Sequence, residues 1–170
     1  MREDKVALLA GAYSLAMILG ALFFQYVIGV LPCEMCHWQR WPHDGAIVAG
    51  LGGAVLFYTH VIDRNTVKLL AWLALLLLVV TAMIGGWQAG LEWRWWPGPS
   101  SCSGPRFVLS ASMDINSPVV SCENAGWRLF GISLAGYNFL CSMGVAILGA
   151  LLLLKKIKLP VPALDRWANS

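Results

Sequence analysis

Four long stretches of the chain carry no charged residue, and their lengths limit what this sequence can fold into. They run from Val6 to Val30, from Gly45 to Tyr58, from Leu69 to Ala89 and from Leu129 to Leu154. A helix needs about 20 residues to cross a bilayer core of roughly 30 Å. Three stretches reach that length, and the second reaches it if the helix begins near Trp38. Because lipid offers no partner to exposed backbone groups, we expect four membrane-spanning helices.

Composition supports a membrane protein of one domain. The 170 residues are 58% hydrophobic and 12% charged, against about 25% charged in a typical soluble protein. The chain is predicted to be all-α, an integral membrane four-helix bundle with spans at roughly 6–30, 38–59, 69–89 and 129–154. A long loop, 90–128, lies between the last two. The first apolar stretch is too long for a signal peptide, so we expect it to remain as the first span.

The positive charges predict which side of the membrane each loop occupies. With an even number of spans, both termini share one side with the Val61–Lys68 loop. That side carries eight Lys and Arg residues, and the other side carries four, Arg40, Arg94, Arg106 and Arg128. Positive residues favour the cytoplasm, so the termini are predicted to be cytoplasmic. The less positive side also holds most of the tryptophans, as expected at a membrane interface: Trp38, Trp41, Trp87, Trp93, Trp95, Trp96 and Trp127.

Four of the five cysteines fall on the predicted outer side, where disulfides persist. Cys33 and Cys36 form a Cys-x-x-Cys motif followed by His37. A disulfide across two residues closes too short a loop to stabilise much, so a redox pair is favoured there. Cys102 and Cys122 form either a structural disulfide or a second redox pair. Cys141 lies within the fourth span and is expected to be a small apolar residue of little reactivity.

Two other chemistries fit parts of this pattern. In a c-type haem site, Cys33 and Cys36 would attach the haem and His37 would ligate it. In a zinc site, the four outer cysteines would be ligands, although the second pair lacks the usual close spacing. His37 and His43 are expected to be interface residues with hydrated rings, and His60 is expected to be equally ordinary.

Arg40 is the charged residue that most suggests a role. It follows Cys36 by four residues, on the same helix face if the helix starts early. A cation there would favour the reactive thiolate, and an arginine at the membrane boundary is costly without a function. The alternative is a membrane anchor. Pro42 favours the first helical turn and predicts that the helix starts there, with Cys36 just before it.

The whole pattern resembles the disulfide bond formation protein B (DsbB) family. The resemblance rests on four spans, a Cys-x-x-Cys-x-x-x-Arg motif at the second, and a second cysteine pair before the fourth. The segments "FFQYVIGVLPCEMCHWQR", "WPGPSSC" and "CENAGWRLFGISLAGYNFLCS" look like family segments, and the likeness covers roughly residues 15–155. The resemblance implies a bacterial inner-membrane enzyme that oxidises a periplasmic thioredoxin-fold dithiol oxidase (DsbA-like) and passes electrons to the membrane quinone pool.

The resemblance also implies residue roles. Cys33 and Cys36 would form the pair coupled to ubiquinone or menaquinone, with Cys36 facing the quinone as a thiolate. Cys102 and Cys122 would exchange with the soluble partner, and Cys102 would form the mixed disulfide. Arg40 would bind the quinone and stabilise the Cys36 thiolate. Membrane lipid is the other expected partner, and no nucleic acid is expected.

Two positions depart from the family pattern. Many relatives carry a His near the outer end of the third span, where this chain has Gln88-Ala89-Gly90, so the role of that His cannot be transferred. Gln39 stands where some relatives have Glu. Two further interpretations stay open: a non-enzymatic membrane scaffold held by two disulfides, and a protein similar to vitamin K epoxide reductase. The latter expects its Cys-x-x-Cys near the end of a later span.

Overall fold

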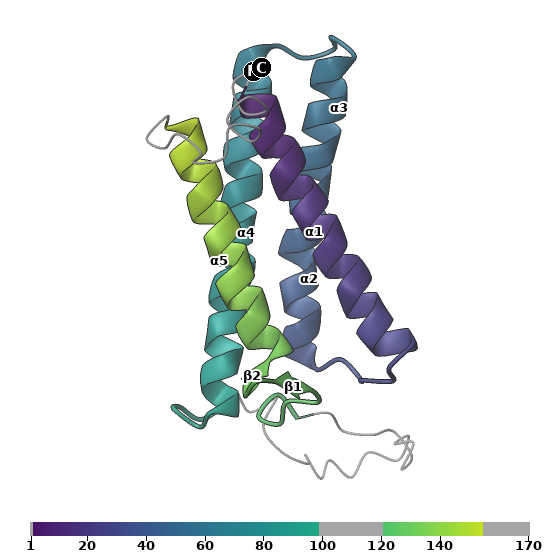
Figure 1. The fold of residues 1–170 in the computed structure, drawn as a ribbon, viewed down its shortest axis with the longest axis vertical. Helices are drawn as coiled ribbons and strands as arrows, with labels where there is room; N and C mark the ends of the chain where they lie inside the picture. Colours follow the sequence, from purple (N-terminus) through teal and green to yellow (C-terminus); the bar gives the residue numbers. More distant parts are fainter. Residues whose placement is uncertain (1, 99–120, 155–170) are drawn as a thin grey trace, which may run out of the picture.

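The computed structural model describes residues 2–98 and 121–154, and this part of the chain is mostly helical. The helices are α1 (Glu3–Tyr26), α2 (Glu34–Ile47), α3 (Gly53–Tyr58), α4 (Arg64–Glu92) and α5 (Leu134–Leu153). A π-helical turn, η1 (Val48–Gly52), connects α2 directly to α3, so these three elements form one continuous rod. The result is the predicted all-α bundle, built from α1, this rod, α4 and α5 (Figure 1).

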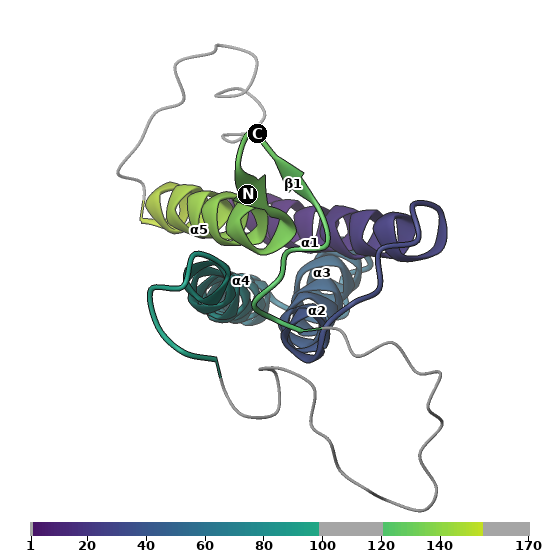
Figure 2. The same cartoon turned by 90° about the horizontal axis from the view of Figure 1, so that it is seen from below.

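The four rods stand in two pairs. Viewed along the bundle, α1 lies beside α5, and α4 lies beside the rod of α2, η1 and α3 (Figure 2). Helix α4 contacts α1, α2 and α5. The α1–α2 connection, the end of α4 and the start of α5 lie at one end of the bundle (Figure 1). We call this the cysteine end, because Cys33 and Cys36 lie there, at the start of α2.

The outer surface of the bundle is apolar. Helices α1, α4 and α5, of 24, 29 and 20 residues, are long and apolar enough to cross a membrane. The η1 turn divides the remaining rod, so neither α2 nor α3 reaches that length alone. Large apolar side chains point outward along the three long helices, including Leu19, Phe23, Leu69, Leu76, Met83, Leu140 and Ile147. Lipid is the environment that such a surface requires.

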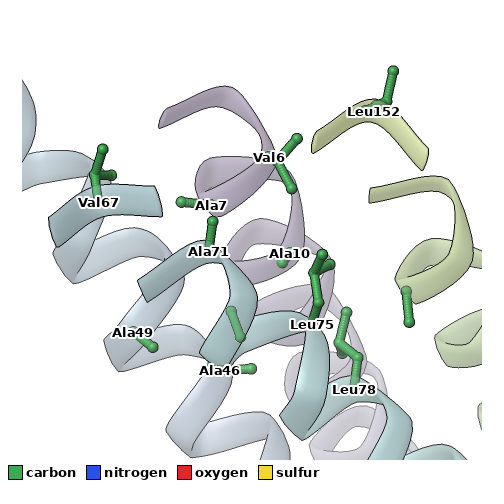
Figure 3. Close-up of a cluster of buried hydrophobic side chains, with 12 residues drawn as sticks. Val6, Ala7, Ala10, Ala46, Ala49, Val67, Ala71, Leu75, Leu78 and Leu152 are labelled. Carbon is green, nitrogen blue, oxygen red and sulfur yellow. The ribbon is translucent and has the colours of Figure 1, made fainter. Parts of the chain in front are cut away.

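Small side chains let the helices approach closely. The main core cluster contains many alanines, from α1, α2, η1, α4 and α5, with a few Val and Leu residues between them (Figure 3). The closest approach joins α1 to η1. A Cβ atom added at Gly50 would lie 2.5 Å from the Ala7 carbonyl oxygen, and one at Gly11 would lie 2.5 Å from the Leu51 nitrogen. Close packing of this kind holds helices together in lipid, where the hydrophobic effect gives no preference for one helix face.

Helix α2 begins earlier than its proline suggests. The Cys33 sulfur caps the helix by accepting a hydrogen bond from the Cys36 backbone N–H at 3.2 Å. The helix therefore starts at Glu34, and Pro42 lies inside it. The prediction that Pro42 marks the first turn was wrong, because the local cap decides where the helix starts. As a consequence, Cys36 and Arg40 lie on one helix at a spacing of four residues.

The other boundaries also shift from the expected spans. Helix α1 ends at Tyr26, and α4 extends to Glu92. The first residues of the fourth predicted span form an antiparallel hairpin of β1 (Arg128–Leu129) and β2 (Ile132–Ser133). Helix α5 begins only after it, because the Ser133 hydroxyl caps α5 by accepting from the Gly136 N–H at 3.2 Å. The hairpin brings the chain back over the cysteine end (Figure 1).

Candidate functional site

The Cys-x-x-Cys motif forms a close pair at the start of α2. Cys33 and Cys36 are both free thiols, and their sulfur atoms lie 2.6 Å apart. Only 4% of Cys33 is exposed. The hydrogen bond with Cys36, together with burial, raises the pKa of the Cys33 thiol. A proton shared by the pair therefore rests on Cys33, and the negative charge falls on Cys36, the better nucleophile.

Gln88 of α4 faces both sulfurs. Its Nε2 atom lies 3.4 Å from the Cys33 sulfur and 3.5 Å from the Cys36 sulfur. The same nitrogen lies 3.3 Å from Oε1 of Glu92, one turn further along α4. Glu92 is 8% exposed. The thiol pair therefore has an amide donor and a buried carboxylate as its nearest polar neighbours on α4.

A chain of buried hydrogen bonds continues inward from Gln88. Gln39 of α2 donates from Nε2 to Gln88 Oε1 at 2.7 Å, and Asn138 of α5 donates from Nδ2 to Gln39 Oε1 at 2.7 Å. Asn138 Nδ2 also donates to the Thr81 hydroxyl oxygen at 3.0 Å. These bonds connect α2, α4 and α5, and they pair polar groups that lie buried between the helices. Such a network is stabilising only if every member is satisfied.

His43 belongs to this network, so the prediction of a hydrated ring at the interface was wrong. The residue is 3% exposed. Its Nε2 lies 3.0 Å from Asn138 Oδ1, and its Nδ1 lies 3.3 Å from the Ser14 hydroxyl. The ring turns inward because α2 begins at Glu34, which places Cys36, Gln39 and His43 along one face of the helix. His37 and His60, by contrast, are exposed.

The structure brings Cys122 next to the Cys33–Cys36 pair. Cys122 is 1% exposed and packs in one buried cluster with Cys33, Met35 and Leu91, against which Cys36 also packs. Cys122 is in a disulfide. Its expected partner, Cys102, lies outside the described residues, so the predicted pairing stays a prediction. Within the described residues, a close pair of thiols and a disulfide cysteine share one buried site.

A cavity of about 400 Å³ opens beside the thiol pair. Its apolar walls come from α1, the α1–α2 connection and α5, including Met17, Phe24 and Leu134. Polar residues also line the cavity, among them Cys36, Gln39, Arg40 and Gln88. Arg40 is half-buried there and makes no side-chain hydrogen bond or ion pair with residues 2–98 or 121–154. The cavity therefore offers a largely apolar space that is lined in part by Cys36 and Arg40.

Sequence reasoning missed most of the polar residues around the pair. Gln39, Gln88 and Glu92 were not predicted as site residues, nor was Asn138. A usable signal was present, because polar residues inside membrane helices are costly and mark functional positions. Gln88 and Glu92 are four residues apart, and Cys36 and Gln39 are three apart, so each pair occupies one helix face. Among the described residues, no three His, Cys, Asp or Glu side chains form a metal-binding group.

The fold and the site together define a helical membrane protein that carries a buried dithiol. The family model described as "Disulfide bond formation protein DsbB" matches residues 3–152. The chain therefore belongs to the DsbB family, and it is a membrane protein of disulfide bond formation. This agrees with the resemblance found in the cysteine and arginine pattern.

Curated relatives agree with the family model. "Disulfide bond formation protein B" of Actinobacillus pleuropneumoniae is 28% identical over 168 residues, covering 91% of this chain and 88% of the relative. The protein of that name from Verminephrobacter eiseniae is 31% identical, with 88% of this chain and 83% of the relative covered. The one from Shewanella loihica is 32% identical, with 80% and 84% covered. No solved structure matches this chain.

Proposed function

We propose that this protein reoxidises a periplasmic thioredoxin-fold dithiol oxidase and passes the electrons to membrane quinone. The partner's dithiol attacks a Cys102–Cys122 disulfide, through a mixed disulfide with Cys102. The partner leaves oxidised, and Cys102 and Cys122 become thiols. Exchange with a Cys33–Cys36 disulfide then re-forms Cys102–Cys122 and reduces the Cys33–Cys36 pair. Two electrons and two protons move at each stage, so each disulfide formed is balanced by one broken.

The observation that carries this proposal is the shared burial of Cys122 with Cys33 and Cys36. Exchange between two cysteine pairs requires their sulfurs to meet without large rearrangement. A scaffold held by two structural disulfides has no such requirement. It also has no use for two free thiols 2.6 Å apart beside a cavity.

The cavity supports quinone as the electron acceptor. A volume of about 400 Å³ lies within the usual range for small-molecule sites, about 300–1,000 Å³. Apolar walls suit a quinone ring, and Cys36, Arg40 and Gln88 are among the polar residues that line the cavity. Bound ubiquinone or menaquinone would supply a two-electron, two-proton acceptor. Arg40 would hold a ring oxygen by charge and hydrogen bonding, and Gln88 and the start of α2 would keep the Cys36 sulfur anionic and facing the cavity.

The charge pattern supports an inner-membrane location with both termini in the cytoplasm. Lys and Arg residues number eight on the side of the termini and four on the side of the cysteines. The cysteine end then faces the periplasm, where a soluble oxidase would meet the Cys102–Cys122 disulfide through Cys102. The exposed tryptophans at this end, including Trp41, Trp87 and Trp95, suit the headgroup region.

Purified protein, reduced thioredoxin-fold oxidase and a short-chain quinone test the proposal. We expect oxidation of the partner and stoichiometric loss of quinone absorbance, with ubiquinone and menaquinone analogues compared separately. Cys36→Ser should abolish quinone reduction yet permit one round of exchange at Cys102 and Cys122. The scaffold interpretation predicts no quinone-dependent oxidation, and Cys→Ser changes would then lower only the thermal stability.

A further inference from the structure

We propose that Gln88 donates hydrogen bonds that hold the Cys33–Cys36 pair ready for thiol exchange, and that Gln39 is a positioning residue that fixes Gln88 in the donating orientation. This inference rests on the proposed exchange at the pair, and it assigns a role to two residues that depart from the family pattern. Neither residue carries a charge, so the effect depends wholly on which way each amide group points.

The orientation of Gln39 follows from two backbone carbonyl groups. Gln39 Nε2 lies 3.4 Å from the Met35 carbonyl oxygen, which can only accept a hydrogen bond. Its nitrogen must therefore face that side. On the other side, Gln39 Oε1 accepts from Asn138 Nδ2, and that nitrogen also lies 3.4 Å from the Thr81 carbonyl oxygen. The Gln39 nitrogen therefore meets the Met35 carbonyl oxygen, and the Asn138 nitrogen meets the Thr81 carbonyl oxygen. If both side-chain amides were flipped, each would place its oxygen against a carbonyl oxygen.

The orientation of the Gln88 side-chain amide is set by its hydrogen bond with Gln39. Because Gln39 Nε2 donates at 2.7 Å, the atom of Gln88 that receives this bond must be its oxygen. The Gln88 nitrogen then points toward the sulfurs at 3.4 and 3.5 Å. Glu92 Oε1 accepts from the same nitrogen at 3.3 Å, which favours the same orientation. The Met35 carbonyl oxygen thus orients Gln39, and Gln39 orients Gln88 so that its nitrogen faces the two sulfurs.

An N–H group directed at sulfur favours the anion over the neutral thiol. Hydrogen bonds to a charged form stabilise that form and increase the thiolate fraction. Other charged groups act on the same pair: Glu92 of α4 opposes the thiolate, while Arg40 of α2 lines the same cavity. Arg128 of β1 donates to the Glu92 carbonyl oxygen at 3.3 Å and partly offsets the carboxylate. The Glu92 carboxylate disfavours a thiolate beside it, and the uncharged N–H donor of Gln88 offsets part of that effect.

The test measures thiolate reactivity in the full-length reduced protein without quinone or partner. Alkylation of Cys36 by iodoacetamide is followed from pH 5 to 10 by tandem mass spectrometry, and the signal is normalised to a cysteine-free peptide of the same protein. Gln88→Met keeps the volume of the side chain and removes the amide. Gln39→Met leaves Gln88 in place and removes only the group that orients it. Thr81→Val is the matched control, because it breaks hydrogen bonds in the same network without touching Gln88.

We expect Gln88→Met to slow Cys36 alkylation about tenfold at pH 7, with the midpoint of the pH profile raised by about one unit. Gln39→Met should give a shift in the same direction, and the double variant should resemble Gln88→Met alone, because Gln39 acts through Gln88. Thr81→Val should leave the midpoint unchanged. A wild-type profile in folded Gln88→Met protein would overturn the proposal, as would an equal shift in Thr81→Val.

Two further measurements keep the result interpretable. Thermal unfolding in detergent establishes that each variant is folded, and Gln88→Asn, which retains a shorter amide, replaces Gln88→Met if that variant fails to fold. Gln88→Asn should then shift the profile less than Gln88→Ala, and equal shifts would contradict the role of the amide. If the wild-type protein does not reduce quinone, the proposed function fails, yet the alkylation profiles still decide the role of Gln88.

Discussion

His43 Nε2 lies 3.0 Å from Asn138 Oδ1, and this bond joins α2 to α5 inside the bundle. Asn138 Oδ1 also accepts from the Ser142 hydroxyl at 2.8 Å, while Asn138 Nδ2 donates to Gln39 Oε1. One α5 side chain thus connects the deepest part of the polar network to the residues beside the sulfurs. The thiol site and the packing of α5 are therefore coupled.

Removing the Asn138 amide should destabilise the protein. Asn138→Ala leaves Gln39 Oε1 and His43 Nε2 without their hydrogen-bond partner in the buried polar network. Each buried group left unsatisfied costs about 1–3 kcal/mol, although membrane hydrogen bonds tend toward the lower end. Thermal unfolding in detergent measures the loss. Leu140→Ala, on the same helix but 53% exposed, is the control and should unfold close to the wild-type temperature. Equal stability of the two variants would contradict the coupling.

The close approach of α1 to η1 should not tolerate a side chain. Gly50→Ala places a methyl group 2.5 Å from the Ala7 carbonyl oxygen. Because backbone cannot move aside easily, we expect a loss of about 1–3 kcal/mol from overpacking. Gly20→Ala is the matched control, since nothing lies within 4 Å of its added Cβ and alanine favours helix. Unfolding midpoints of both variants decide whether this contact holds the bundle together.

Replacing Arg40 should weaken the reaction with quinone and leave folding unchanged. Arg40→Met removes a cation from the cavity, so the apparent quinone KM should rise and kcat/KM should fall. Loss of one charged hydrogen bond is about 1.5–3 kcal/mol, or roughly 10- to 150-fold. Arg40→Lys should recover part of this, because the charge remains while the planar donor fork is lost. Steady-state quinone titrations at matched folded concentration give these values.

A membrane anchor would behave differently at the same position. It predicts lower expression or stability of Arg40→Met with unchanged quinone kinetics in the folded fraction. Arg94→Asn removes a positive charge from the same end of the protein, outside the cavity lining. That control should retain wild-type kinetics. Equal losses in both variants would point to general surface charge instead of a quinone contact at Arg40.

Labelling from each side of the membrane should establish the orientation. A cysteine introduced at Val61, which is 68% exposed, should react with an impermeant maleimide only after the cytoplasmic side is opened. One introduced at Phe130, which is 91% exposed, should react in intact spheroplasts. After reduction, Cys102 and the half-buried Cys36 should react from the periplasmic side, whereas Cys33 and Cys122, which are 4% and 1% exposed, should react slowly. Cys141 should remain unlabelled. The reverse pattern at Val61 and Phe130 would overturn the proposed topology.

The sequence alone was enough to predict a helical membrane bundle. Apolar length fixes where helices form, because a backbone in lipid must satisfy its own hydrogen bonds. The four spans, the motif of Cys33, Cys36 and Arg40, and the second cysteine pair together indicated the family, which the family model confirms. Local sequence signals for a helix start were less reliable where two of them competed. Pro42 predicted a helix start, but the Cys33 cap begins α2 eight residues earlier, at Glu34.

The tertiary structure decided which polar residues surround the thiols. In a soluble helix, apolar periodicity shows which face points inward, but lipid makes the outer face apolar too, so this signal disappears. Gln39, Gln88 and Asn138 meet because close packing of α2, α4 and α5 sets the rotation of each helix. Cys122 reaches the Cys33 site through long-range folding, which no local pattern specifies. Sequence therefore determined the helices and the cysteine motif, and packing determined the polar groups that surround those sulfurs.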